Sequence, residues 1–179
     1  MDPALQLALR AAFALLLATA ASHKLRDLAG FCELLAGYEI MPRAIVGAVA
    51  RAVTLAEAIL AAMLLFGVGV PLAGALVSTL LLAYGAAIHV NVRRGRTDID
   101  CGCMGPASRV PLGHALVVRN LLLAFAAALL LVPEAPRELA LLDGVSVVAT
   151  SAALSACWLA SERLLALAPR VVALRRTAS

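Results

Sequence analysis

Two cysteines separated by one glycine, Cys101-Gly102-Cys103, form the motif of this chain that most directly suggests chemistry. Two thiols this close can form a small disulfide ring. An extended i, i+2 pair lies near the upper limit of the roughly 4.4–6.8 Å between Cα atoms that a relaxed disulfide needs. Gly102 opens backbone conformations that could relieve this strain. Because a strained disulfide is easily reduced, the motif favours a redox carrier over a structural crosslink.

Three interpretations of the motif stay open. The pair could be a redox-active dithiol, or it could be two ordinary loop cysteines. It could also bind a soft metal such as copper(I), because Met104, His89 and His114 lie near it in the sequence. The chain has no second pair of closely spaced cysteines that would complete a closed thiolate site. We therefore assign no metal ligands, and keep a non-enzymatic copper-handling or scaffold protein as the alternative function.

Composition indicates which elements must position the motif. Of the 179 residues 63% are apolar, only 4% are aromatic, and the mean hydropathy is +0.97. Soluble chains are nearer half apolar. Leu, Ala and Val are helix-compatible, and a helix satisfies its own backbone hydrogen bonds in lipid. The net charge of +4 does not indicate nucleic acid, because the basic residues lie in loops and helix ends, where they orient a membrane protein.

Apolar runs near the ~20 residues that cross a bilayer predict five transmembrane helices. They cover residues 5–22, 44–66, 71–92, 111–132 and 139–160. A short amphipathic helix over 24–37 is expected at the interface, and the loop 93–110 holds the Cys-Gly-Cys motif. We expect one all-α domain over 1–179, a polytopic membrane bundle. Its four-helix core has the fifth transmembrane helix and the interfacial helix beside it.

The first apolar run has some features of a signal peptide, with Ala18-Thr19-Ala20 as a cleavage site. The residues before it, Met1-Asp2-Pro3, carry no basic side chain. We therefore expect an uncleaved helix.

Five spans place the two ends of the chain on opposite sides of the cell membrane. The side of the Cys101 loop also collects most basic residues, namely Lys24, Arg26, Arg43, Arg93, Arg94, Arg96, Arg109, Arg170, Arg175 and Arg176. The positive-inside rule predicts that this side faces the cytoplasm. Cys32 lies there too, as a relay thiol or as a small apolar residue on a buried helix face. Cys157, within the fifth span, is expected to be structural.

Ionisable residues inside membrane spans are functional candidates by default. Glu57 lies about 13 residues into the second span, near mid-membrane at ~1.5 Å per residue. Arg119 and Asn120 lie two turns into the fourth span, and Lys24 ends the first. We expect Glu57 to pair with Arg119, or otherwise with Arg51, because a lone charge at this depth costs several kcal/mol. Such a pair could serve function or could only fix helix register.

Several of these residues together resemble the methylamine utilisation protein MauE family, within the wider group of DoxX-like membrane proteins. The residues that carry the resemblance are Lys24-Leu25, Phe31, Tyr38, Pro42, Glu57, Arg94-Gly95-Arg96, Ile99-Asp100-Cys101-Gly102-Cys103-Met104-Gly105 and Arg119-Asn120. Family members commonly have Phe where this chain has Met104. The resemblance implies a role in maturing methylamine dehydrogenase, or a similar redox enzyme, with a thioredoxin-like partner that handles disulfides.

The sequence and the resemblance together predict membrane thiol–disulfide exchange, and the chain is a candidate membrane thiol–disulfide oxidoreductase. Cys101 and Cys103 would exchange with a partner thiol through a mixed disulfide. Lys24, Glu57, Arg119 and Asn120 would form a polar floor beneath them. Electrons could pass to a membrane quinone, by analogy with vitamin K epoxide reductase. Disulfide formation belongs outside the cytosol, which opposes the side that the charges predict.

Overall fold

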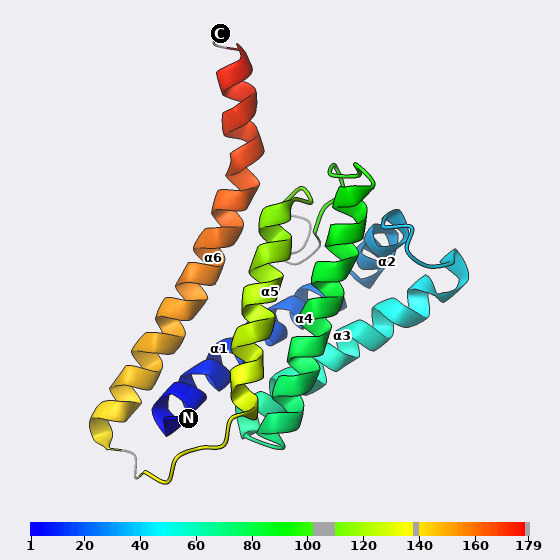
Figure 1. Cartoon of the computed structure of the whole chain (residues 1–179). Helices are drawn as coiled ribbons and strands as arrows, with labels where there is room; N and C mark the ends of the chain where they lie inside the picture. The colour runs from blue at the N-terminus through cyan, green and yellow to red at the C-terminus, as the bar shows by residue number, and fades with distance from the viewer. Residues whose placement is uncertain (102–109, 138–139, 178–179) are drawn as a thin grey trace.

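The computed structural model describes residues 1–101, 110–137 and 140–177. The described residues form helices joined by short connections (Figure 1). The helices are α1 (Pro3–Arg26), α2 (Leu28–Gly37), α3 (Arg43–Phe66), α4 (Val70–Arg93), α5 (His114–Ala128) with the 3-10 turn η1 (Leu129–Leu131), and α6 (Leu141–Thr177).

Five of these helical segments are long and apolar enough to cross a membrane. They are α1, α3, α4, the stretch His114–Leu131 that joins α5 to η1, and residues Leu142–Ser161 of α6. The shorter α2 lies between the first two spans. The predicted fold class, an all-α polytopic membrane bundle with a short additional helix, is confirmed, and the chain is a multi-pass membrane protein.

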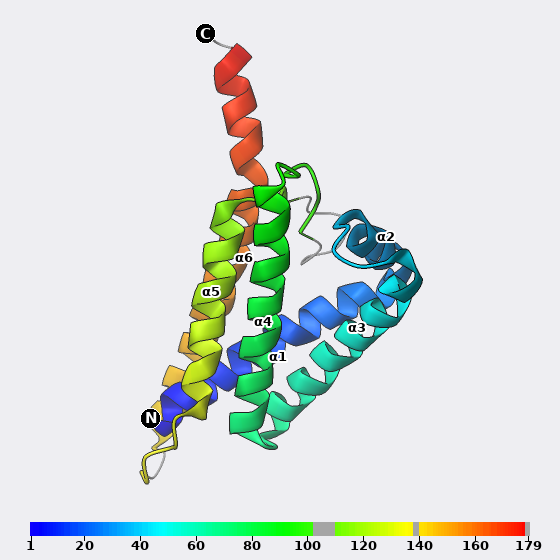
Figure 2. The ribbon, with the colours of Figure 1, turned by 45° about the vertical axis from the view of Figure 1, so that its right-hand side comes forward.

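The transmembrane helices associate as two close pairs. α1 lies along α3, and α4 lies along α5. α3 and α4 meet at the turn that joins them and diverge from there (Figure 2). α6 packs on α1, and its membrane-spanning part is only 6% buried inside the protein. The start of α1 and the end of α6 lie at opposite ends of the molecule (Figure 1).

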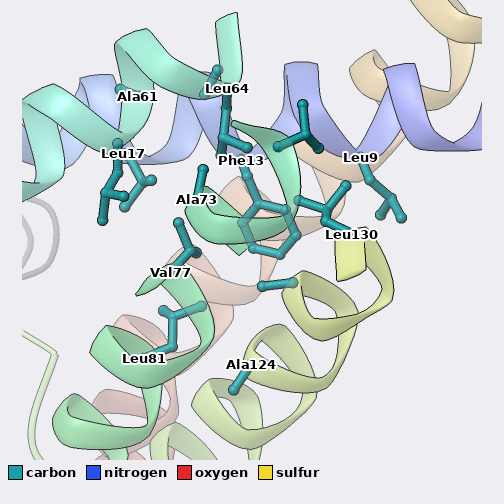
Figure 3. Packing of buried hydrophobic residues seen from close by; sticks show 14 residues of the cluster. Leu9, Phe13, Leu17, Ala61, Leu64, Ala73, Val77, Leu81, Ala124 and Leu130 are labelled. Atoms are coloured by element: carbon teal, nitrogen blue, oxygen red, sulfur yellow. The ribbon is translucent and has the colours of Figure 1, made fainter. Parts of the chain in front are cut away.

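Apolar side chains from α1, α3, α4, α5 and η1 pack where the two pairs meet (Figure 3). Leu64, Ala73, Val77 and Leu130 have no exposed surface. Gly74 permits the close approach of α4 to η1, because a Cβ built there would lie 2.7 Å from Leu130 Cβ. Small residues of this kind let transmembrane helices pack closely. The contact therefore fixes the α4–α5 pair.

Arg10 connects the start of α1 to the end of α3. Its Nε donates a hydrogen bond to the carbonyl of Leu64 at 3.2 Å. The guanidinium also fills the space beside Gly67, which ends α3 with a left-handed φ of 72°. A cation here is favourable, since the carbonyls at a helix C-terminus carry partial negative charge. Arg10 therefore contributes to holding α1 against α3.

Two helices are longer than the sequence suggested. α1 continues to Arg26, because Lys24 turns inward to a partner on α3, and Asp27 ends the helix. Asp27 also caps α2 by accepting a hydrogen bond from the Gly30 amide at 2.9 Å. α6 continues from the expected end at residue 160 to Thr177. Its further residues are rich in Leu, Ala and Arg, which are good helix formers in any solvent.

We predict that Gly74→Ala destabilises the bundle by about 1–3 kcal/mol, the usual cost of overpacking a close contact. The new methyl group would collide with Leu130 Cβ and with the Ala127 carbonyl oxygen 3.0 Å away. Gly47→Ala in α3 is the matched control, because nothing lies within 4 Å of a Cβ there. Unfolding midpoints in detergent micelles measure both changes. Equal midpoints for the two variants would contradict the packing described here.

Candidate functional site

Backbone hydrogen bonds hold Cys101 in place. They join residues 97–101 to residues 110–112. The Cys101 amide donates to the Val110 carbonyl at 3.0 Å, and the Leu112 amide donates to the carbonyls of Thr97 and Ile99 at 3.0 and 3.2 Å. Cys101 is partly buried and disulfide-bonded, whereas Cys32 and Cys157 carry free thiols. Cys103, the second predicted catalytic residue, lies outside the described residues.

Tyr38 contacts the backbone of Cys101 from the end of α2. Its hydroxyl lies 3.4 Å from the carbonyl oxygens of both Asp100 and Cys101, as a donor. The side chain is only 5% exposed and packs against Ile88 and Leu116. Burial, followed by the nearby Asp100 carboxylate, raises the pKa of Tyr38 well above its ordinary value. The phenol therefore remains protonated, and remains a donor, at any physiological pH.

Arg119 of α5 reaches the sulfur of Cys101. Its Nη2 lies 4.0 Å from Cys101 Sγ, and its Cζ lies 4.8 Å from the centre of the Trp158 ring on α6. A guanidinium beside a sulfur stabilises the thiolate over the thiol once the disulfide is reduced. Cation–π stacking on Trp158 supports this position of the guanidinium. Cys101, Arg119 and Trp158 thus form a connected group.

Lys24, Glu57 and Tyr84 form a second polar group, inside the contact of α1, α3 and α4. Glu57 Oε1 accepts hydrogen bonds from Lys24 Nζ and from the Tyr84 hydroxyl, the latter at 2.6 Å. Lys24 Nζ also lies 4.9 Å from the centre of the Phe31 ring and 5.1 Å from that of Tyr84. Lys24 and Glu57 are 6% and 1% exposed. The pair is therefore fully enclosed by protein.

The expected pairing of Glu57 with Arg119 is wrong. α1 lies along α3 and brings Lys24 to Glu57, whereas Arg119 belongs to α5, which packs on α4. The alternative partner, Arg51, is exposed on α3. Asn120 is buried beside Gly85, and its amide donates to the Leu116 carbonyl of its own helix at 2.8 Å. Of the four predicted supporting residues, only Arg119 is shown beside Cys101.

Sequence reasoning missed Tyr84 and Trp158, and it named Tyr38 only among the residues that carry the family resemblance, without a role. A signal was present, because the chain has one Trp and two Tyr among 179 residues. A polar aromatic residue in such a composition is a candidate for a specific hydrogen bond or stacking contact. The remaining cysteines are placed apart: Cys32 is half-buried on α2, and Cys157 is exposed on α6. The relay role of Cys32 stays a prediction.

The Arg94-Gly95-Arg96 sequence connects α4 to the segment between α2 and α3. Both guanidinium nitrogens of Arg96 contact the Glu39 carboxylate, at 2.7 and 2.9 Å, and Arg94 Nη1 donates to the Glu39 carbonyl at 3.3 Å. Glu39 adopts a left-handed φ of 49°, which is uncommon for a residue with a side chain. These contacts hold α2, and with it Tyr38, close to the start of the Cys101 loop.

No group of three or more His, Cys, Asp or Glu side chains that could hold a metal occurs among residues 1–101, 110–137 and 140–177. His89 and His114, considered above as metal ligands, are both exposed. Met104 lies outside the described residues.

We predict that Lys24→Met and Glu57→Gln each destabilise the protein by about 3–5 kcal/mol, because each leaves a buried charge without its partner. The double variant should cost less than the sum by about 0.5–3 kcal/mol, as interacting residues do. A second cycle that combines Glu57→Gln with Arg119→Gln is the control and should be additive. Chemical unfolding in micelles measures both cycles. Additivity in the first cycle, or coupling in the second, would contradict the assignment.

Comparison with known proteins identifies the family. A family model described as methylamine utilisation protein MauE matches residues 2–133. Proteins described as methylamine utilization protein MauE are 37% identical in Paracoccus denitrificans over 124 residues (69% of this chain, 66% of the relative), and 35% identical in Methylophilus methylotrophus over 155 residues (86% and 79%). A third, from Methylorubrum extorquens, is 39% identical over 137 residues (75% and 74%).

The chain thus spans slightly less than two thirds of the Paracoccus relative's length. No solved structure is significantly similar to the chain. The family match covers α1 to η1 and ends before α6. It contains Cys101, Arg119, Tyr38 and the Lys24–Glu57–Tyr84 group. The resemblance found in the sequence is confirmed, and the chain belongs to the methylamine utilisation protein MauE family.

Proposed function

We propose that this chain is a membrane thiol–disulfide exchange protein of methylamine utilisation. It would act with a thioredoxin-like partner in the maturation of methylamine dehydrogenase or a similar redox enzyme. The observation that carries the proposal is the arrangement at Cys101. This cysteine is disulfide-bonded, it is fixed by backbone hydrogen bonds, and the Arg119 guanidinium lies 4.0 Å from its sulfur. The family supports the pathway, since its relatives are described as methylamine utilization proteins.

The exchange step uses Cys101 and Cys103 as a pair. A thiolate of the partner attacks one sulfur of their disulfide, so that a mixed disulfide forms and the other cysteine leaves as a thiolate. The second thiol of the partner then attacks the mixed disulfide. The partner departs oxidised, and the cysteines remain as a dithiol after taking up two electrons and two protons. The reverse sequence transfers a disulfide to this chain.

Arg119 supports the step by its charge. When the disulfide opens, negative charge develops on the leaving sulfur, and a fixed cation nearby lowers the energy of that state. Tyr38 and the paired arms of the loop act differently, since they bind the backbone of residues 100 and 101 and so fix where the sulfur lies. The Lys24–Glu57–Tyr84 group positions the three helices on which α2 and the loop rest.

The direction of electron flow depends on the side that the loop faces. The charge distribution predicts the cytoplasmic side. On that side thiols are kept reduced, so the pair would accept electrons from a cytosolic thioredoxin-like protein. On the outer side the same pair would act as a thiol oxidase. The side stays a prediction from the basic residues.

We predict that Cys101→Ser and Cys103→Ser each abolish maturation of the partner enzyme while the protein remains in the membrane, because exchange needs both sulfurs. Cys157→Ser is the control, since that thiol is exposed on α6, and should leave maturation unchanged. Partner activity in cells, with trapping of the mixed disulfide in each serine variant, provides the measurement. Full maturation with either loop variant would refute thiol exchange. A loss with Cys32→Ser would establish Cys32 as a relay.

We further predict that Arg119→Gln slows alkylation of reduced Cys101 at neutral pH roughly tenfold, because the thiolate loses its neighbouring cation. Arg119→Lys should retain part of the rate, since the charge remains. Arg51→Gln removes an exposed cation from α3 and serves as the control. Iodoacetamide labelling in a Cys32→Ser, Cys103→Ser, Cys157→Ser background measures the rate at one thiol. An unchanged rate in Arg119→Gln would show that the guanidinium does not act on the sulfur.

A further inference from the structure

α6 lies against α1 through a hydrogen bond inside the membrane. Only 6% of its membrane-spanning part is buried inside the protein, yet Ser151 in that part is buried. The Ser151 hydroxyl lies 3.2 Å from the carbonyl oxygen of Ala8 on α1, and 2.7 Å from that of Val147 on its own helix. Hydroxyl groups that bond across transmembrane helices hold the helices together, because lipid tails offer no replacement partner. α6 therefore has a defined position along α1.

Ion pairs fix the start of α6 at the same end as the start of α1. The Arg137 guanidinium lies 2.8 Å from the Asp143 carboxylate on α6, and 3.4 Å from the Asp2 carboxylate before α1. Because these groups are exposed to water, the pairs contribute little free energy. They do determine which parts of the two helices lie side by side, and the Ser151 contact continues the same alignment along α6.

This alignment brings Trp158 of α6 to Arg119 of α5. Ser151 and Trp158 are about two helical turns apart, so they lie on the same face of α6. The centre of the Trp158 ring lies 4.8 Å from Arg119 Cζ, and Arg119 Nη2 lies 4.0 Å from Cys101 Sγ. α6 thus contributes one residue to the thiol site, from outside the family match that ends at residue 133.

The contact between Trp158 and Arg119 does not depend on the redox state of the sulfur. Cys101 is disulfide-bonded, so its sulfur carries no charge that would attract a guanidinium. An aromatic ring attracts a cation through the negative charge over its face, whether the disulfide is closed or open. A long arginine side chain in a membrane helix can otherwise extend towards the headgroups. Trp158 therefore keeps the cation near the sulfur before negative charge develops there, which is the condition for preorganised stabilisation.

We propose that Trp158 is a positioning residue, which holds the Arg119 guanidinium beside Cys101 and makes α6 part of the thiol site. This inference rests on the proposed function, because it concerns the same sulfur. When a partner thiolate attacks Cys103, a new S–S bond forms to Cys103. Cys101 then leaves as a thiolate with the electron pair of the broken bond. The guanidinium stabilises this thiolate only while it is nearby, and the indole ring raises the fraction of time for which it is.

Trp158 has an ordinary alternative role as an interfacial aromatic residue. Tryptophan is enriched at the membrane surface whether or not it contacts a functional group. Such a residue would stabilise the position of α6 in the bilayer but would not change the ionisation of a thiol on another segment. The two roles therefore differ in a measurable property, the pH dependence of the reactivity of Cys101.

The test is the pH–rate profile of Cys101 alkylation by iodoacetamide, in full-length protein in phosphatidylcholine nanodiscs and in the single-thiol background described above. Trp158→Leu should slow the rate at neutral pH roughly threefold and move the midpoint of the profile to higher pH, because the cation is held less firmly. Trp158→Phe keeps an aromatic face and should retain most of the rate. Leu159→Ala, at an exposed neighbouring position on α6, is the control and should leave the profile unchanged.

A double-mutant cycle tests whether Trp158 acts through Arg119. In the Arg119→Gln background, Trp158→Leu should not move the midpoint further. An equal shift with and without Arg119 would overturn the inference. An unchanged midpoint in both backgrounds would also overturn it and would leave Trp158 as an interfacial aromatic residue. So would a lower plateau rate at an unchanged midpoint, because the ring would then control only access to the sulfur.

The position of α6 is tested at Ser151. Ser151→Ala should move the midpoint in the same direction as Trp158→Leu but by less, since other contacts of α6 remain. Ser155→Ala is the matched control, because that hydroxyl donates to the Ser151 carbonyl of its own helix at 2.8 Å. Equal effects of the two alanine variants would overturn the role given to the Ser151 contact. Exchange with a thioredoxin-like protein is measured separately. Its absence, with the midpoints as expected, would count against the proposed function and not against the role of Trp158.

Discussion

A carboxylate near the middle of a membrane must find a cation inside the protein, and this requirement organises the bundle. Glu57 meets it with Lys24 of α1 and the hydroxyl of Tyr84 of α4. Three helices are thereby fixed relative to one another by groups that no lipid can replace. In water such a pair would add little, but in hydrocarbon the separated charges are too costly to persist. The ion pair thus determines how these helices lie along one another. Close apolar contacts elsewhere in the bundle, such as Gly74 against Leu130, then pack the remaining helix surfaces together.

Because Glu57 is paired with Lys24, Arg119 does not have to neutralise it and lies beside Cys101 instead. If Glu57 took Arg119, the guanidinium would be withdrawn from Cys101. With Glu57 paired to Lys24, Arg119 can lie between the sulfur of Cys101 and the ring of Trp158. The protein thus separates the ion pair that holds its helices from the cation that serves its thiol. The loop backbone is held by other residues again. The Tyr38 hydroxyl binds it, and the ion pair between Glu39 and Arg96 holds the neighbouring segment, without contacting the Lys24–Glu57 pair.

Hydropathy predicted the helical membrane class, and five described helical segments are long and apolar enough to cross a membrane, because that signal depends only on local composition. It could not predict which helices are neighbours. Lys24, Glu57 and Arg119 were recognised as important, yet their partners depended on α1 lying along α3, which no local pattern encodes. Lys24 was read as the end of a span, whereas α1 continues past it to Arg26. Trp158 lies 39 positions beyond Arg119 in the chain, and only the packing of α6 on α1 brings them together.

The two cations of α1 have a consequence for how the protein is assembled. Arg10 binds the end of α3, and Lys24 binds its middle, so both partners are synthesised only after α1 itself. Until α3 enters the bilayer, α1 carries two charges whose acceptors do not yet exist. Lys24 can extend towards the headgroups in the meantime, but Arg10 lies further into the apolar run. Biogenesis should therefore favour insertion of α1 and α3 as a hairpin with α2 at its bend, and α1 should pass from the translocon to lipid only when α3 follows.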